Sequence, residues 1–163
     1  MPYYFAYGSN MSPQQMAARC PGARALGSAR LEGWRFHITT RGTASILPHS
    51  ERAVHGVLWR CSYEHVHTLD RFEGVAWRNY FRRHVAVEIS DGRSLRALTY
   101  VSARRYPGVA RANYMLTRVI PAAMAFDLPK IYLAELESWL TARPIADRKA
   151  GYRGRKTPTR APR

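Results

Sequence analysis

Strand-like segments occupy most of the first two-thirds of this chain, and helix-like segments gather at its end. Apolar and aromatic runs typical of strands cover residues 2–7, 29–40, 44–47 and 54–60, and helical patterns cover residues 112–126, with a kink or restart at Pro121, and a segment that opens at Leu128-Pro129. Residues 80–89 alternate apolar and polar side chains, and Asp91-Gly92 predicts a hairpin turn to a partner strand at 94–101. Because no regular strand–helix–strand rhythm appears, this order predicts an α+β fold.

Two short helices are predicted between the strands by the residues at their ends. Ser12 is suited to cap the first, and Gln15 is placed to complete a capping box with it. Ser62 is suited to cap the second, over residues 63–72, and Gly74 follows as a stop signal.

The positive charge of the chain is unevenly distributed. The 163 residues include 26 Lys and Arg against 11 Asp and Glu, a formal net charge of +15. Residues 144–163 hold seven of these basic residues and one Asp, are rich in Pro, Gly and Thr, and almost lack aliphatic side chains. We therefore expect a domain over residues 1–143 and a flexible basic tail over 144–163. The charge indicates either contact with nucleic acid, through this tail, or an ordinary domain with a basic appendage.

No cofactor, metal or membrane signal is found in the sequence. Cys20 and Cys61 do not form a disulfide framework and indicate buried thiols in a reducing compartment. His65 and His67 are two residues apart on a predicted helix, which directs them to different sides and disfavours a shared metal. No run of about 18–20 apolar residues is present, and the first ten residues lack the layout of a signal peptide. We expect a cytoplasmic protein that uses neither a metal nor a cofactor.

The segment Tyr3–Met11, YYFAYGSNM, joins a predicted strand to the first capped helix. A Gly-Ser-Asn turn at such a place directs several backbone N–H groups the same way, and these groups can hold a carboxylate or a phosphate. An ordinary strand-to-helix turn is the commoner meaning of these three residue types. The pattern alone favours that structural alternative.

Glu73 lies at the carboxyl end of the helix predicted over residues 63–72, near Phe72, Trp77 and Tyr80 in the sequence. The helix dipole disfavours a negative charge there, and apolar surroundings would desolvate it, so both effects would raise the pKa of Glu73 toward a value useful in proton transfer. A solvated glutamate at a helix end is the alternative.

Taken together, these motifs resemble the γ-glutamylcyclotransferase family. The opening YFAYGSNM (Tyr4–Met11) is similar to the family's signature loop, and further similarity follows in the correct order at ARL (29–31), GVLW (56–59), Leu69-Asp70, Glu73-Gly74-Val75, Tyr80, Tyr114, Leu128-Pro129, Tyr132 and Leu136. The resemblance covers about residues 3–140 and excludes the tail. Two positions depart from the family pattern: Trp77-Arg78 are bulkier than expected, and Pro121 interrupts the helix after Tyr114.

The resemblance implies a small mixed β-barrel flanked by helices, and an enzyme that cyclises a γ-glutamyl amino acid or amide to 5-oxoproline with release of the amine. It implies that Glu73 is the general acid/base, and that the substrate is held by Tyr7, Gly8, Ser9, Asn10, Tyr80 and Tyr114. It leaves open whether the backbone N–H groups of the loop hold the α-carboxylate or the developing oxyanion. The asparagine of Tyr-Gly-Ser-Asn favours the group that acts on γ-glutamyl amino acids. The alternative is a basic nucleic-acid-binding or interaction protein on the same fold, without turnover.

Overall fold

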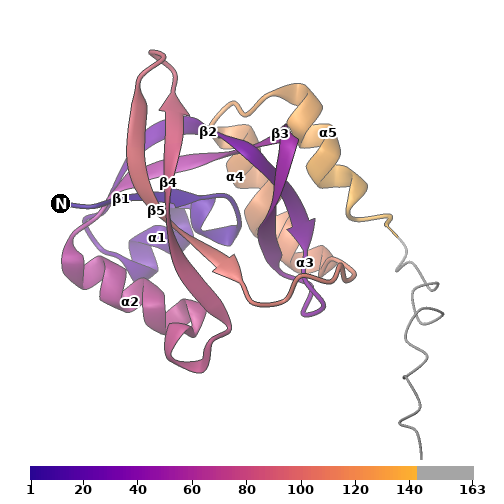
Figure 1. Ribbon diagram of the computed structural model, residues 1–163, viewed down its shortest axis with the longest axis horizontal. Coiled ribbons are helices and arrows are strands. Elements are labelled where there is room, and N and C mark those ends of the chain that lie inside the picture. The colour runs from indigo at the N-terminus through magenta and orange to yellow at the C-terminus, as the bar shows by residue number, and fades with distance from the viewer. Residues whose placement is uncertain (143–163) are drawn as a thin grey trace, which may run out of the picture.

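Five strands close into a barrel in the order β1-β3-β2-β4-β5 (Figure 1). They are β1 (Tyr3–Ala6), β2 (Arg24–Ile38), β3 (Ala44–Arg60), β4 (Tyr80–Ile89) and β5 (Ser94–Ser102) in the computed structural model, which describes residues 1–142. All neighbouring strands are antiparallel except β1 and β5, which run parallel and meet at Tyr4 and Leu98. The small mixed barrel and the α+β class are thereby confirmed. The predicted tail, 144–163, lies outside the described residues.

The long β2–β3 hairpin differs from the prediction of two separate strands at 44–47 and 54–60. These segments are one strand of 17 residues, paired with β2 from Arg24–Arg60 to Ile38–Ala44. Pro48 pairs with Trp34, where the register shifts between Glu32 and Trp34. A residue without an N–H is tolerated at such an irregularity, so the strand continues through the proline.

Helices cover two sides of the barrel, with α1 and α2 on one side and α4 and α5 on the other (Figure 1). The helices are α1 (Pro13–Arg19), α2 (Tyr63–Glu73), α3 (Ala112–Tyr114), α4 (Ile120–Ala125) and α5 (Lys130–Ser138). The restart predicted at Pro121 is confirmed: a π-helical segment, Met115–Val119, leads from α3 into α4, and Pro121 lies in the first turn of α4. Proline has no N–H to donate to the preceding turn, so the ladder changes there. No helix of residues 1–142 is both long enough and apolar enough to span a bilayer.

The predicted serine caps of α1 and α2 both form, but the capping box is found at α2 and not at α1. Ser12 Oγ accepts a hydrogen bond from the backbone N–H of Gln15, but the Gln15 side chain turns away from Ser12, so the capping box predicted there is wrong. The box forms instead at α2, where Ser62 and His65 each bond the backbone of the other. Gly74 ends α2 in the left-handed conformation, as predicted.

Cys20 and Cys61 are free and buried, as the sequence predicts. Burial raises the pKa of Cys61 to about 12 and also raises the pKa of Cys20. Neither thiol is therefore ionised near neutral pH, and both act as small packing groups.

Candidate active site

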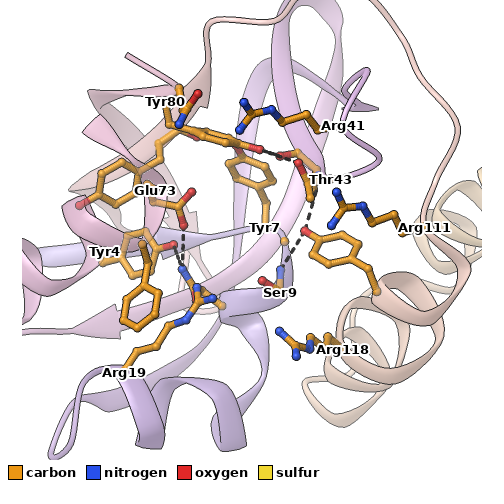
Figure 2. Close-up of a pocket in the computed structure, with 17 residues that line it drawn as sticks. Tyr4, Tyr7, Ser9, Arg19, Arg41, Thr43, Glu73, Tyr80, Arg111 and Arg118 are labelled. Carbon is orange, nitrogen blue, oxygen red and sulfur yellow. Dashed lines mark hydrogen bonds between the residues drawn. The ribbon is translucent and has the colours of Figure 1, made fainter. Parts of the chain in front are cut away.

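A cavity of about 340 Å³ lies where the segment after β1, the end of α2 and the α3 region meet (Figure 2). All seven site residues predicted from the sequence line it: Tyr7, Gly8, Ser9, Asn10, Glu73, Tyr80 and Tyr114. The fold thus brings together residues that are up to 107 positions apart in the chain. The volume is within the range that holds a small molecule.

Glu73 is the last residue of α2, and it is the one acidic residue among the described residues that line the cavity. Burial raises its pKa from 4.5 to about 7, although the charge of Arg19 and a hydrogen bond from Asn10 both lower it. The predicted contribution of Trp77 is wrong, because that side chain is 83% exposed. Tyrosines shield the carboxyl group instead, since Tyr4 and Tyr80 line the cavity beside it (Figure 2).

The Asn10 side chain is buried and fully hydrogen-bonded. Its Nδ2 donates to Tyr4 Oη at 2.9 Å and to Glu73 Oε1 at 3.2 Å. Its Oδ1 accepts from Gln15 Nε2 and from Arg19 Nη1, both at 2.8 Å. These four bonds leave one orientation for the amide, in which a donor points at Glu73.

Gln15 does not line the cavity but bonds three residues that do, a supporting role that the sequence reasoning missed. Its Nε2 also donates to Ser9 Oγ at 2.7 Å, and its Oε1 accepts from Arg118 Nη1 at 2.6 Å. Gln15 therefore links the loop after β1 to the π-helical segment that follows α3. In the sequence, Gln15 stands three residues after Ser12, and a capping box accounts for a glutamine at that position. No other signal in the sequence indicated that Gln15 supports the site.

Tyr114 extends from α3 to the loop after β1 and occupies a backbone N–H group that a ligand could otherwise bind. Its hydroxyl oxygen accepts the backbone N–H of Ser9 at 3.2 Å and that of Ala44 at 3.3 Å. The Ser9 N–H, expected from the resemblance to face a substrate, is therefore occupied by Tyr114. Because the tyrosine oxygen accepts two bonds, its own proton is left to donate toward the cavity.

Gly8 is required by the closeness of Tyr114. A Cβ atom at position 8 would lie 2.8 Å from the Tyr114 hydroxyl oxygen and 3.2 Å from Ala44 Cβ. The first distance is shorter than real Cβ contacts, so any other residue displaces the hydroxyl from the loop.

The hydroxyl groups of the other two predicted tyrosines, Tyr80 and Tyr7, donate hydrogen bonds to backbone oxygens of the protein. Tyr80 Oη donates to the backbone oxygen of Ala44 at 2.8 Å and lies 3.1 Å from Thr43 Oγ1. Tyr7 Oη donates to the backbone oxygen of Tyr100. Both residues shape the wall of the cavity. Of the three predicted tyrosines, Tyr114 is the one whose hydroxyl donates to no group within residues 1–142.

Asp70 anchors α2, and with it Glu73, to the barrel. Arg82 on β4 forms an ion pair with Asp70, through Nε at 2.7 Å and through Nη2, and Tyr100 Oη on β5 donates to the same carboxylate at 2.9 Å. Burial alone would raise the pKa of Asp70, but the hydrogen bonds from Arg82 and Tyr100 hold it below its ordinary value. This contact settles where the end of α2 lies against the strands.

Four arginines line the cavity, and none of them was predicted: Arg19, Arg41, Arg111 and Arg118. They come from the end of α1, the β2–β3 turn, the residue before α3 and the π-helical segment. Arg78, which lies in the departure from the family pattern, is exposed and does not line the cavity. Across residues 1–142, no three His, Cys, Asp or Glu side chains gather closely enough to hold a metal ion.

Comparisons with known proteins agree with this geometry. Residues 4–116 match the family model described as "Gamma-glutamyl cyclotransferase, AIG2-like". The γ-glutamylcyclotransferases of Bos taurus and Mus musculus are 26% and 28% identical to this chain over 145 residues, which is 83% of this chain and 77% of each relative. A solved structure described as a γ-glutamyl cyclotransferase has the same fold, with a TM-score of 0.79 over 96% of this chain and 93% of the other, at 23% identity. The chain therefore belongs to the AIG2-like γ-glutamyl cyclotransferase family.

Proposed function

We propose that this protein cyclises a γ-glutamyl amino acid or amide to 5-oxoproline and releases the amine, with Glu73 as the general acid/base. The observation that carries the proposal is the position of Glu73: a carboxyl group with a pKa of about 7, facing a small cavity beside the Tyr-Gly-Ser-Asn loop. A pKa near the working pH lets one group both accept and donate a proton. The relatives named γ-glutamylcyclotransferase support the reaction class.

In this reaction the substrate supplies its own nucleophile. Glu73 takes a proton from the α-ammonium group, and the free amine attacks the γ-carbonyl carbon to form the lactam C–N bond. The bond from that carbon to the leaving nitrogen then breaks as Glu73 returns the proton to the leaving nitrogen. Glu73 next takes the second proton from the ring nitrogen, which leaves the lactam N–H, and passes that proton to the released amine, so the carboxylate is regenerated. Because nucleophile and carbonyl are in one molecule, the enzyme gains mainly by folding the substrate and moving protons.

Tyr114 is the group we assign to the charge that develops on the γ-carbonyl oxygen. Its hydroxyl receives two backbone N–H bonds, from Ser9 and Ala44, and these polarise the O–H toward a negative acceptor. The loop backbone would then act through this hydroxyl. Tyr114→Phe is expected to lower kcat and leave the cavity shape unchanged.

The test is release of 5-oxoproline from a panel of γ-glutamyl compounds by the wild type and by Glu73→Gln. We expect Glu73→Gln to lose activity by about 10²–10⁴-fold, the usual contribution of general acid/base catalysis. Glu64→Gln is the matched control, because Glu64 is an exposed glutamate on the same helix, and it should retain wild-type rates. Undiminished turnover by a folded Glu73→Gln enzyme would contradict the mechanism.

A further inference from the structure

Three of the arginines that line the cavity form one wall. The guanidinium groups of Arg41, Arg111 and Arg118 face the cavity from the side opposite Glu73 (Figure 2). Arg19 lies on the Glu73 side, where it donates to Asn10 and stacks on the Phe72 ring at 4.2 Å. We call the first three residues the arginine wall.

The charges of the arginine wall are not neutralised by the domain. Within residues 1–142, the ion pairs involve other arginines, and no carboxylate oxygen lies within 4.0 Å of these three side chains. Arg118 donates to the neutral amide of Gln15. A cavity with three such cations on one side attracts a ligand that brings negative charge there.

Two of the segments that carry the arginine wall, those of Arg41 and Arg111, are bonded to each other. The backbone N–H of Arg111 donates to the Gly42 oxygen at 3.2 Å, and the N–H of Gly108 donates to the Ile38 oxygen at 2.8 Å. Thr39 and Pro107 pair as an isolated bridge between the same two segments. The turn that carries Arg41 and the segment that carries Arg111 are therefore joined, which fixes the spacing of the two backbones from which the side chains extend.

The number of carboxylates differs among γ-glutamyl substrates. Every one has the α-carboxylate of its glutamyl half, and its α-ammonium group faces Glu73 in the proposed reaction. The leaving group adds further carboxylates to this one. An amine adds none, a neutral amino acid adds one, and an amino acid with a carboxylate side chain adds two. From the arginine wall we infer that the preferred leaving group is an amino acid with a carboxylate side chain. This inference rests on the proposed function.

The discriminating pair is γ-glutamyl-glutamate and γ-glutamyl-glutamine, which are nearly identical in shape and differ by one charge. We expect kcat/KM for 5-oxoproline release to favour γ-glutamyl-glutamate by at least about tenfold, the factor that one charge-assisted hydrogen bond supplies. The difference should be mainly in KM and should shrink as NaCl is raised, because salt screens exposed charges. γ-Glutamyl-n-butylamine should be the poorest of the three.

Substitutions in the arginine wall test whether it causes the preference for γ-glutamyl-glutamate. Arg41→Gln/Arg111→Gln should bring the two dipeptides to within about twofold by removing the charged donors that favour one of them. Arg83→Gln is the control, because Arg83 is an exposed arginine on β4 that does not line the cavity, and it should keep the wild-type ratio.

The possible failures are distinguishable. Equal kcat/KM for the two dipeptides in the wild type, or an undiminished preference in the folded double variant, would overturn the inference and leave the proposed function standing. No 5-oxoproline from any compound would overturn the proposed function and this inference with it. The salt dependence is measured on the wild type and does not rely on the variants folding.

Discussion

Two carboxylates one turn apart on α2 have opposite electrostatic surroundings. Asp70 receives bonds from Arg82 and Tyr100, and its pKa is lowered. Glu73 is half-buried and receives a hydrogen bond from the neutral Asn10 amide, and desolvation raises its pKa to about 7. The first carboxylate is thereby suited to anchoring the helix and the second to proton transfer.

This contrast predicts a pH profile. In the proposed reaction Glu73 must be ionised to accept the ammonium proton, so kcat/KM should rise with pH through a midpoint near 7. Asn10→Ala removes the bond that stabilises the carboxylate, and the midpoint should move to higher pH. The measurement is the pH dependence of 5-oxoproline release, with Glu64→Gln as the control. A profile that is flat across neutral pH, or an unmoved midpoint in Asn10→Ala, would contradict the assignment.

The contact between Gly8 and Tyr114 predicts a compensating pair. Gly8→Ala should lose activity and destabilise the protein by about 1–3 kcal/mol, the usual cost of overpacking, because its Cβ displaces the Tyr114 hydroxyl. Adding Tyr114→Phe removes the oxygen atom concerned and should restore part of the stability without restoring activity. Thermal unfolding of the four proteins in a double-mutant cycle measures the coupling. Additive effects would show that the two residues do not meet.

At the scale of elements, the helix caps and the hairpin turn were predictable, whereas strand ends were not: β2 begins at Arg24 and ends at Ile38, not at 29 and 40. Ser62, Gly74 and Asp91-Gly92 act through their own backbone neighbours, and all are found where the sequence places them. The long strand β3 was not predicted, because its middle is exposed and polar and contains Pro48, while the partner that holds it comes from β2. Caps and turns depend on hydrogen bonds between residues close in the sequence, so local patterns predict them. The length of a strand depends on a partner strand that can be distant in the sequence, so local patterns do not predict it.

Gly74 tests whether the end of α2 positions Glu73. Its backbone is left-handed, with φ at 63°, and a Cβ there would lie 2.6 Å from Asn79 Nδ2. Gly74→Ala should therefore lower both the melting temperature and 5-oxoproline release. Gly92→Ala is the matched control, since Gly92 also has a positive φ of 81° but has open space around it.

We expect Gly92→Ala to cost about 1 kcal/mol, as a strained backbone does, and to leave kcat/KM unchanged. Equal effects of the two substitutions on activity would mean that the left-handed turn contributes stability alone.

At the scale of the whole molecule, the sequence shows how large the positive charge is but does not show which basic residues line the cavity. The sequence placed a large share of the positive charge on residues 144–163, which lie outside the described residues. It did not indicate that four arginines from separate segments would line the cavity. The loop and Glu73 could be found because their motifs are contiguous, whereas Arg41, Arg111 and Arg118 meet only through the fold.

The alternative of nucleic-acid binding is tested by removing residues 144–163. We expect the shortened protein to keep its 5-oxoproline release and to lose any salt-dependent binding to DNA or RNA, because seven basic residues leave with the segment. Titration with labelled oligonucleotides at several salt concentrations measures this. Binding that survives the deletion would assign it to residues 1–143 and strengthen the alternative.

The joined segments that carry Arg41 and Arg111 are separate in the chain from the loop after β1 and from the end of α2. Replacing residues 39–43 and 104–111 together would exchange Arg41 and Arg111, two of the three residues proposed to meet the departing amine, and would keep Glu73, Asn10 and Tyr114. Under the proposed function, such an exchange would change which compounds are consumed and would keep the residues assigned to ring closure. A protein engineer can graft the same two segments between relatives as one cassette.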